Sequence, residues 1–348
     1  NQGHCHPRLL KALRRQAAKV TLTSRAFRND QLPFFCQEVC ELTGYEKVLP
    51  MNSGAEAVET AIKAARKWGY TVKGVEADKA EIICCNNNFH GRTVTVISFS
   101  TDEQYRAGFG PLTPGFKMVP FGDLEALKQA ITPNTVAFLA EPIQAEGGVI
   151  VPPEGYLAEV GKLLKEQNVL YILDEIQTGL GRCGKMFAHQ WEDAHPDLVI
   201  LGKALSGGFY PVSAVVGSEA VLGVFKPGDH GSTFGGNPLG AAVAMAALDI
   251  IVDEKLCDRS QELGEYFRER LAAMESPYVK EIRGRGLLTG VEVTEEVGTA
   301  YPFCKKLMTE GILCKDTHET AIRFAPPLTI TREELDWALE RIEKVLTA

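Results

Sequence analysis

Residues 198–208 read LVILGKALSGG and combine a short apolar segment, a single lysine and a glycine-rich turn. The apolar run 198–201 is typical of a strand that is covered on both faces of a sheet. Lys203 follows it, where a charged amine in apolar surroundings destabilises the fold unless its charge is paired or removed. A covalent imine with a cofactor aldehyde removes that charge. We therefore predict that Lys203 carries a cofactor aldehyde.

The sequence on either side of this stretch alternates short apolar strands with helices. Alternation of this kind predicts an α/β fold with a mostly parallel sheet, covered by helices on both faces, and ligands at the carboxyl ends of the strands. Helices are expected between the strands, for example over 124–131 and 156–166. The predicted strands span residues 82–85, 117–120, 136–140, 169–173, 198–201 and 212–216.

The composition changes after a long apolar helix predicted over 238–253, and a chain of 348 residues is long enough for two domains. The later segments predict a smaller α+β unit, with helices over 259–274, 303–310 and 331–347 and strands over 287–293 and 321–324. We expect a large domain over 19–255 and a small C-terminal domain over 256–348. Residues 1–18 are expected to be the remnant of an N-terminal segment that packs with the small domain.

Charge and composition narrow the range of partners. The formal net charge of -8 argues against nucleic acid, because a phosphate-binding surface needs a basic excess. No apolar run approaches the roughly 20 residues of a membrane helix, so no membrane partner is expected. Small-molecule chemistry is the remaining expectation.

The nine cysteines form an odd and scattered set, which indicates a reducing compartment. We expect the cytoplasm or the mitochondrial matrix. The chain begins at Asn1 without a methionine, so we expect upstream residues, with any targeting peptide, to be missing. His4, Cys5 and His6 lack a second ligand cluster downstream, so we predict a structural turn there and no metal site.

Ser53 and Glu56 have the spacing of a capping box, and an apolar stripe continues from Val58. A glycine-containing turn thus opens a helix. Such a start directs backbone N–H groups and the positive end of the helix dipole at one point, which suits a phosphate. The alternative is an ordinary capped helix.

Asp174 and Glu175 follow the apolar run 169–173, and Lys203 follows the run 198–201. An acid and a lysine at neighbouring strand ends can meet a flat ligand from opposite sides. Pyridoxal phosphate needs this pair, because the lysine binds its aldehyde and the carboxylate keeps its pyridine nitrogen protonated. The alternative is a buried salt bridge between Lys203 and Asp174.

Other segments add to the predicted cofactor site. Phe89, in NNNFHGRT, is able to stack on a ring, and Ser232 and Thr233, in HGSTFGGNP, supply hydroxyls in a glycine-rich loop. A dehydrogenase is disfavoured, because no GxGxxG lies between a first strand and helix. A cofactor-binding protein without turnover is disfavoured because Asp174 and Lys203 are both present.

Six segments together carry a family resemblance that spans essentially the whole chain: NSGAEAVETAIKAAR, FHGRT, EPIQAEGG, LDEIQTGLGRCG, LGKALSGGFYPVSAV and HGSTFGGNPLG. They resemble the omega-amino-acid aminotransferases, which are pyridoxal phosphate enzymes of the aspartate aminotransferase-like fold. This implies a seven-stranded-type sheet in the large domain. Within that group, NQGHCHP, LTSRAF, VLPMNSG, ARKWGYTVKG, KPGDHGSTFGGNPLG and RFAPPL are most similar to the ornithine aminotransferase branch.

The resemblance implies a role for each cofactor residue. Lys203 would bind the aldehyde and shuttle protons, Asp174 would hold the pyridine nitrogen and Gln177 the ring hydroxyl. Thr233 would reach the phosphate in a neighbouring subunit, which implies a homodimer with shared active sites. Phe89 would stack on the ring, Glu141 would support its edge, Ser53, Gly54 and Ala55 would hold the phosphate, and His90 and Ser232 complete the expected cofactor-binding set.

The resemblance also implies the substrates. An arginine at Arg323 would hold the alpha carboxylate of glutamate, and Glu146 would neutralise it when L-ornithine is bound. Arg92 would bind the distal carboxylate of glutamate or the alpha carboxylate of ornithine. The implied reaction moves the delta-amino group of L-ornithine to 2-oxoglutarate and gives glutamate 5-semialdehyde and glutamate.

Two departures concern the substrate. His90 stands where animal ornithine aminotransferases have tryptophan and where acetylornithine aminotransferases have histidine. The substrate-contacting tyrosines of the family lie upstream of Asn1. The alternative reaction is therefore transamination of acetylornithine or of another omega-amine.

Overall fold

A seven-stranded mixed sheet forms the centre of the larger lobe in the computed structural model of the protein, which describes residues 1–347. The strand order is β1-β7-β6-β5-β4-β2-β3. The strands β3, β2, β4, β5 and β6 run parallel to one another, β7 is antiparallel to β6, and β1 is antiparallel to β7. The strands are β1 (Lys47–Met51), β2 (Glu81–Cys85), β3 (Phe116–Val119), β4 (Thr135–Ala140), β5 (Leu170–Asp174), β6 (Leu198–Leu201) and β7 (Ser213–Gly217). The predicted α/β fold with a mostly parallel sheet is confirmed.

Helices cover both faces of this sheet, which explains why the central strands are apolar throughout. Successive side chains of a strand point to opposite faces. Ile172 therefore packs with α3 (Gly54–Trp68) on one face, and Leu173 packs with α6 (Leu124–Ala130) and α7 (Tyr156–Glu166) on the other. Every residue of β4, β5 and β6 is buried.

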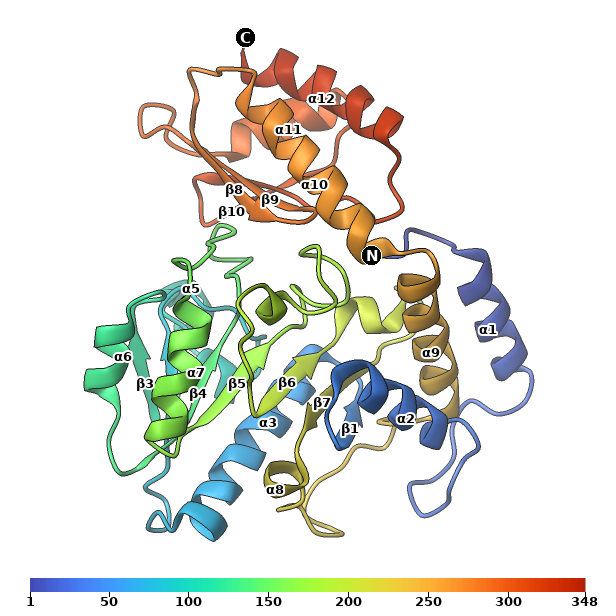
Figure 1. Cartoon of the computed structure of the whole chain (residues 1–348), viewed down its shortest axis with the longest axis vertical. Helices are drawn as coiled ribbons and strands as arrows, with labels where there is room; N and C mark the ends of the chain where they lie inside the picture. The colour runs from blue at the N-terminus through green and yellow to red at the C-terminus, as the bar shows by residue number, and fades with distance from the viewer. Residues whose placement is uncertain (348) are drawn as a thin grey trace.

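The remaining segments of the larger lobe surround this three-layered centre (Figure 1). The long helix α9 (Pro238–Asp253) packs against α1 (Pro7–Ala17) and α2 (Leu32–Thr43). The shorter elements are η1 (Gly69–Lys73), α4 (Val94–Ile97), α5 (Glu103–Arg106), η2 (Ala188–Trp191), η3 (Lys203–Ser206) and α8 (Glu219–Leu222).

The smaller lobe is built on a four-stranded antiparallel sheet of order β10-β11-β9-β8. Its strands are β8 (Val279–Arg285), β9 (Leu288–Val293), β10 (Lys315–Thr317) and β11 (Ala321–Phe324), and its helices are α10 (Leu256–Ala272), α11 (Tyr301–Thr309) and α12 (Arg332–Leu346). The sequence did not predict β8 and β10. The segment VKEIRGR is rich in charged residues and KDT has only three residues, so both lack a strand's apolar signal.

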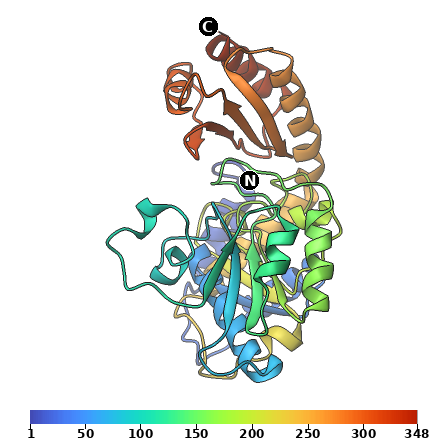
Figure 2. The same ribbon diagram turned by 90° about the vertical axis from the view of Figure 1, so that its left-hand side faces the viewer.

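Figures 1 and 2 show the smaller lobe stacked on one end of the larger lobe, with the N-terminus at the junction. Lys255, between α9 and α10, has a left-handed backbone with φ 51°. The domain boundary at residue 255 stays a prediction. The packing of residues 1–18 with the small domain also stays a prediction. In this segment α1 lies along α9 of the larger lobe, whereas the Asn1 carbonyl accepts the N–H of Leu328 in the smaller lobe.

Within residues 1–347, no helix has both the length and the apolar character that crossing a membrane requires.

Candidate active site

A cavity of about 160 Å³ lies where β2, β4, β5 and β6 end. The carboxyl ends of parallel strands meet at one edge of a sheet, so the residues that follow them converge. Eight of the predicted cofactor residues line this cavity, together with two residues that were not predicted. The lining residues are Gly54, Ala55, Phe89, His90, Gly91, Glu141, Asp174, Ile176, Gln177 and Lys203.

Lys203 opens into this cavity from the first residue of η3. Its backbone has φ 40°, a left-handed conformation that is uncommon for a residue with a side chain and is often found at functional sites. The Nζ atom donates to Gln177 Oε1 at 2.5 Å. The walls of the cavity desolvate the amine and lower the pKa of Lys203, which opposes the raising effect of Asp174, Glu146 and Glu141. A lowered pKa favours the neutral, nucleophilic amine.

Asp174 is buried at the end of β5 and is held by two donors. Its Oδ2 lies 2.6 Å from His90 Nδ1, and its Oδ1 accepts the Ile176 N–H at 3.0 Å. No ion pair within the described residues 1–347 joins Asp174 to Lys203, so the alternative of a buried salt bridge between them is wrong. Glu175 contacts a different region, where its Oε1 lies 3.0 Å from His189 Nδ1.

His90 is buried, and its Nε2 has no hydrogen-bond partner. Burial lowers the pKa of His90, but the hydrogen bond and charge of Asp174 outweigh burial and raise that pKa overall. The imidazole therefore supports a negative charge on Asp174. The sequence placed His90 at the cofactor, and its observed contact is with the carboxylate beside the cavity.

Glu141 follows β4 and is buried at the cavity wall. Its carboxylate accepts the Phe89 N–H at 3.1 Å and the Ala145 N–H at 3.4 Å. Burial raises the pKa of Glu141 to about 7. The side chain thus ties the loop after β2, which carries Phe89, to the loop after β4.

The capping box at the start of α3 is confirmed. Ser53 Oγ accepts the Glu56 N–H at 3.2 Å, and Glu56 Oε2 accepts the Ser53 N–H at 2.7 Å. Among the described residues, no hydrogen-bond acceptor takes the N–H of Gly54 or of Ala55, and both residues line the cavity. The Ser53 hydroxyl is already used by the cap, so Gly54 and Ala55 are the free donors for an anion.

Ser232 and Thr233 lie outside this cavity. Ser232 Oγ accepts from Asn52 Nδ2 at 2.7 Å, directly before the start of α3. Thr233 is exposed and lines a separate hollow of about 200 Å³ with Arg25 and other residues. The structure of one chain therefore does not bring Thr233 to Lys203.

Arg323 and Glu146 form an ion pair, with Arg323 Nη1 2.6 Å from Glu146 Oε1. The Arg323 side chain is 14% exposed and that of Glu146 is 19% exposed. Arg323 and Lys203 line a second cavity of about 150 Å³, which shares Ile176 and Gln177 with the first. Arg323 of the predicted carboxylate switch thus shares a cavity with Lys203, and its role as a switch stays a prediction.

Arg92 is exposed and lies outside both cavities. Its guanidinium carbon is 3.6 Å from the centre of the Tyr105 ring and 5.5 Å from that of Phe89. The cation therefore borders the Phe89 wall, and a carboxylate contact remains a prediction.

Two lining residues, Gly91 and Ile176, were not predicted. A Cβ atom at Gly91 would lie 3.0 Å from the Cβ of Ala55, so glycine permits the close approach of this loop to α3. Ile176 directly follows the predicted acids at the end of β5, and that position is the signal that would have identified it. Within residues 1–347, no group of three or more His, Cys, Asp and Glu side chains is arranged to hold a metal ion.

The cavity residues fit pyridoxal phosphate. Phe89 and Ile176 offer apolar walls to a flat ring, Lys203 offers a desolvated amine, and Asp174 offers a carboxylate without a lysine partner. His90 Nε2 has no hydrogen-bond partner, so it is able to form a hydrogen bond with a ligand in the cavity. The N–H groups of Gly54 and Ala55 are available to a phosphate. The fold and the site define a pyridoxal phosphate-dependent aminotransferase.

Comparison with known proteins agrees and specifies the family. Residues 1–346 match the class-III aminotransferases, and the chain belongs to that family. It is 62% identical to the ornithine aminotransferase of Geobacillus sp. (strain WCH70), over 99% of this chain and 86% of that protein. Class-III aminotransferases depend on pyridoxal phosphate.

Solved structures show the same relationship. The ornithine aminotransferase of Toxoplasma gondii, crystallised with partial occupancy of pyridoxal phosphate at its active site, has a TM-score of 0.98 and 50% identity, covering 99% of this chain and 83% of that chain. The acetylornithine aminotransferase of Elizabethkingia anophelis has a TM-score of 0.89 and 48% identity, covering 99% and 86%.

Proposed function

We propose that the protein transfers the delta-amino group of L-ornithine to 2-oxoglutarate and releases glutamate 5-semialdehyde, which cyclises to pyrroline-5-carboxylate, and glutamate. The observation that carries this proposal is the Arg323–Glu146 pair beside Lys203. Glutamate must present an alpha carboxylate next to its reacting amine, whereas ornithine must present none there. A guanidinium with a removable internal carboxylate satisfies both requirements.

Free energies explain why the pair discriminates. Leaving one member of a buried ion pair alone costs about 3–5 kcal/mol. A substrate that separates Arg323 from Glu146 must therefore replace Glu146 with its own carboxylate. Glutamate does so, while ornithine bound through its terminal amine leaves the pair closed.

Four residues would hold the cofactor. The Gly54 and Ala55 N–H groups would bind its phosphate, Phe89 would offer an apolar face to its ring, and Asp174, which His90 contacts, would supply a negative charge for the pyridine nitrogen. Bound pyridoxal phosphate supplies a covalent attachment for the substrate nitrogen and withdraws electrons from the carbon that bears it.

Lys203 is the acid and base of the proposed reaction. The lowered pKa of Lys203 favours the neutral form of the amine, and in that form Nζ would take a proton from the substrate carbon and return it later. Gln177 holds Nζ in the cavity between these steps.

We also propose that the active form is a homodimer with shared active sites. Thr233 is exposed and does not line the Lys203 cavity of its own chain, as expected for a residue that serves a partner. Phe27, Phe34 and Phe234 are exposed, with 72%, 62% and 45% of their surface accessible, and Phe27 lines the same hollow as Thr233. Such apolar side chains are typical of an interface.

Mixing two inactive variants tests the dimer. Lys203→Ala and Thr233→Val chains, refolded together, should regain part of the activity, because one of the two sites in a mixed dimer is intact. Sedimentation as a monomer, or no recovery on mixing, would contradict shared sites.

All nine cysteines are free, which supports a reducing compartment such as the cytoplasm or the mitochondrial matrix.

The second candidate reaction is transamination of acetylornithine, favoured by His90 and by the Elizabethkingia structure. Steady-state kinetics with ornithine and acetylornithine in parallel tests the proposal. We expect a higher kcat/KM for ornithine, and a clear preference for the acetylated amine would overturn it.

A further inference from the structure

A second cation, Lys315, lies on the far side of the Glu146 carboxylate. Lys315 Nζ is 3.2 Å from Glu146 Oε2, while Arg323 Nη1 is 2.6 Å from Oε1. The carboxylate thus bridges the two cations through its two different oxygens. Lys315 is 64% exposed, and it does not line the Lys203 cavities.

The sheet of the smaller lobe imposes this geometry. Lys315 of β10 and Arg323 of β11 are directly opposite in an antiparallel register. Side chains at such positions share one face of the sheet, and like charges placed opposite each other repel. Glu146 enters from the larger lobe and neutralises both, so the two cations compete for one anion.

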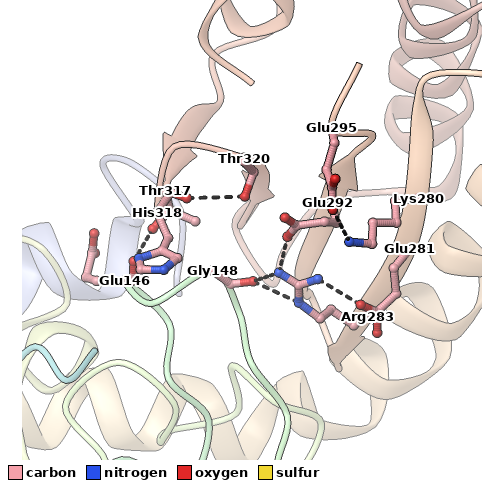
Figure 3. A network of polar contacts seen from close by, with 10 residues as sticks. All are labelled: Glu146, Gly148, Lys280, Glu281, Arg283, Glu292, Glu295, Thr317, His318 and Thr320. Atoms are coloured by element: carbon pink, nitrogen blue, oxygen red, sulfur yellow. Dashed lines mark hydrogen bonds and ion pairs between the residues drawn. The ribbon is translucent and has the colours of Figure 1, made fainter. Parts of the chain in front are cut away.

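The backbone of the loop that carries Glu146 is fixed. Figure 3 shows Arg283 and Thr317 reaching from the smaller lobe to the carbonyls of this loop. Arg283 Nε and Nη2 donate to the Gly148 carbonyl at 3.0 and 2.6 Å, and Thr317 Oγ1 donates to the Glu146 carbonyl.

These contacts hold a strained conformation. Val149, a β-branched residue, has φ 57°, which surrounding contacts must stabilise. Because the backbone of the loop is anchored, separating the Glu146 carboxylate from Arg323 requires a rotation of the Glu146 side chain alone.

The charges around Glu146 favour its ionised form. Burial raises the pKa of Glu146, but hydrogen bonds and charges from Arg323 and Lys315 outweigh burial and hold the pKa below its ordinary value. A carboxylate that stays ionised after losing Arg323 needs another cation, because an unpaired buried charge is costly.

We infer that Lys315 is a positioning residue that holds Glu146 when a substrate carboxylate takes Arg323. With Lys315 present, Glu146 that has lost its ion pair with Arg323 keeps its ion pair with Lys315. Without it, the same loss leaves Glu146 unpaired beside the bound substrate. Lys315 therefore favours the glutamate and 2-oxoglutarate side of the reaction, and it leaves ornithine, which keeps the switch closed, almost unaffected. This inference rests on the proposed function of the Arg323–Glu146 pair.

Single-turnover measurements on the holoenzyme test the inference, because they separate the two half-reactions. In Lys315→Met we expect the apparent Kd for glutamate to rise about fivefold, the size expected for loss of one partly exposed ion pair, while that for ornithine changes by less than about twofold. The Kd of glutarate, a dicarboxylate that cannot react, should rise by about the same factor as that of glutamate. Equal losses with glutamate and ornithine, or unchanged glutamate binding, would overturn the inference.

Three further variants sharpen the result. Lys315→Arg keeps the charge and should bind glutamate like the wild type. Lys344→Met removes a lysine of similar exposure, 67%, that pairs with Glu310 and not with Glu146, and it should change neither half-reaction. In a Glu146→Gln background, Lys315→Met should have no further effect on glutamate, because the residue acts through Glu146. A further loss in that background would overturn the inference.

Failure of the proposed function has a different signature. If the wild type rejects ornithine while it binds glutamate, the proposed reaction is wrong. The glutamate and glutarate arms still decide the role of Lys315 in that case.

Discussion

Glu146→Ala removes the internal anion that competes with substrate carboxylates for Arg323. The Arg323 and Glu146 side chains are only 14% and 19% exposed, and their charges are 2.6 Å apart. Loss of one partner of a buried pair costs about 3–5 kcal/mol, and the residual exposure reduces this to about 3 kcal/mol here. In the variant, Arg323 recovers this free energy by binding any substrate carboxylate. Ornithine bound through its alpha carboxylate should therefore gain roughly a hundredfold relative to its delta-first orientation.

Product identification measures this change in orientation. The wild type should give glutamate 5-semialdehyde, detected as pyrroline-5-carboxylate. Glu146→Ala should give a substantial share of the 2-oxo acid, which cyclises to the isomeric pyrroline-2-carboxylate. Glu146→Asp, which keeps the charge, is the control and should retain the product of the wild type. Unchanged product ratios in Glu146→Ala, with normal turnover, would refute the switch.

Three further results are expected. His90→Ala removes the donor at Asp174 Oδ2, so the affinity for pyridoxal phosphate should fall about tenfold in a spectral titration, and an unchanged affinity would contradict the supporting role. Burial raises the pKa of Glu141 from 4.5 to about 7, so the stability from this group is present in full below pH 4.5 and is lost as pH rises through 7. Between pH 4.5 and 8 the unfolding free energy of the wild-type apoenzyme should therefore fall by about 3 kcal/mol more than that of Glu141→Gln. Urea unfolding at a series of pH values measures both, and an equal fall in the two proteins would contradict this assignment. Lys203→Ala should lose transamination but retain the cofactor through its phosphate contacts, which turnover and equilibrium dialysis measure together, and wild-type turnover would exclude the catalytic role.

The cavity was predictable because its residues follow apolar strands. Asp174 and Lys203 each follow an uninterrupted apolar run, and parallel strands bring such positions together. The chain pattern did not separate Asp174 from Glu175, since adjacent residues at a strand end point to opposite sides. The family resemblance assigned the cofactor role to Asp174, and the structure places Asp174 at the cavity and Glu175 beside His189.

The second partner of the switch was not predictable from the sequence. Lys315 stands in a three-residue strand with the sequence KDT, which has no apolar alternation. Its position opposite Arg323 depends on the register of that strand, and its contact with Glu146 depends on how the two lobes meet. Arg283 was missed for the same reason, because its strand is charged along most of its length.

The measurement that tests the central claim most directly is an isotope transfer. The holoenzyme is incubated with 2-oxoglutarate and ornithine that carries ¹⁵N only at the delta position, and the glutamate formed is examined by mass spectrometry. We predict that the label appears in glutamate with the wild type and that Lys203→Ala transfers none. Glutamate formed without the label, or label transfer at the wild-type rate by Lys203→Ala, would contradict the account.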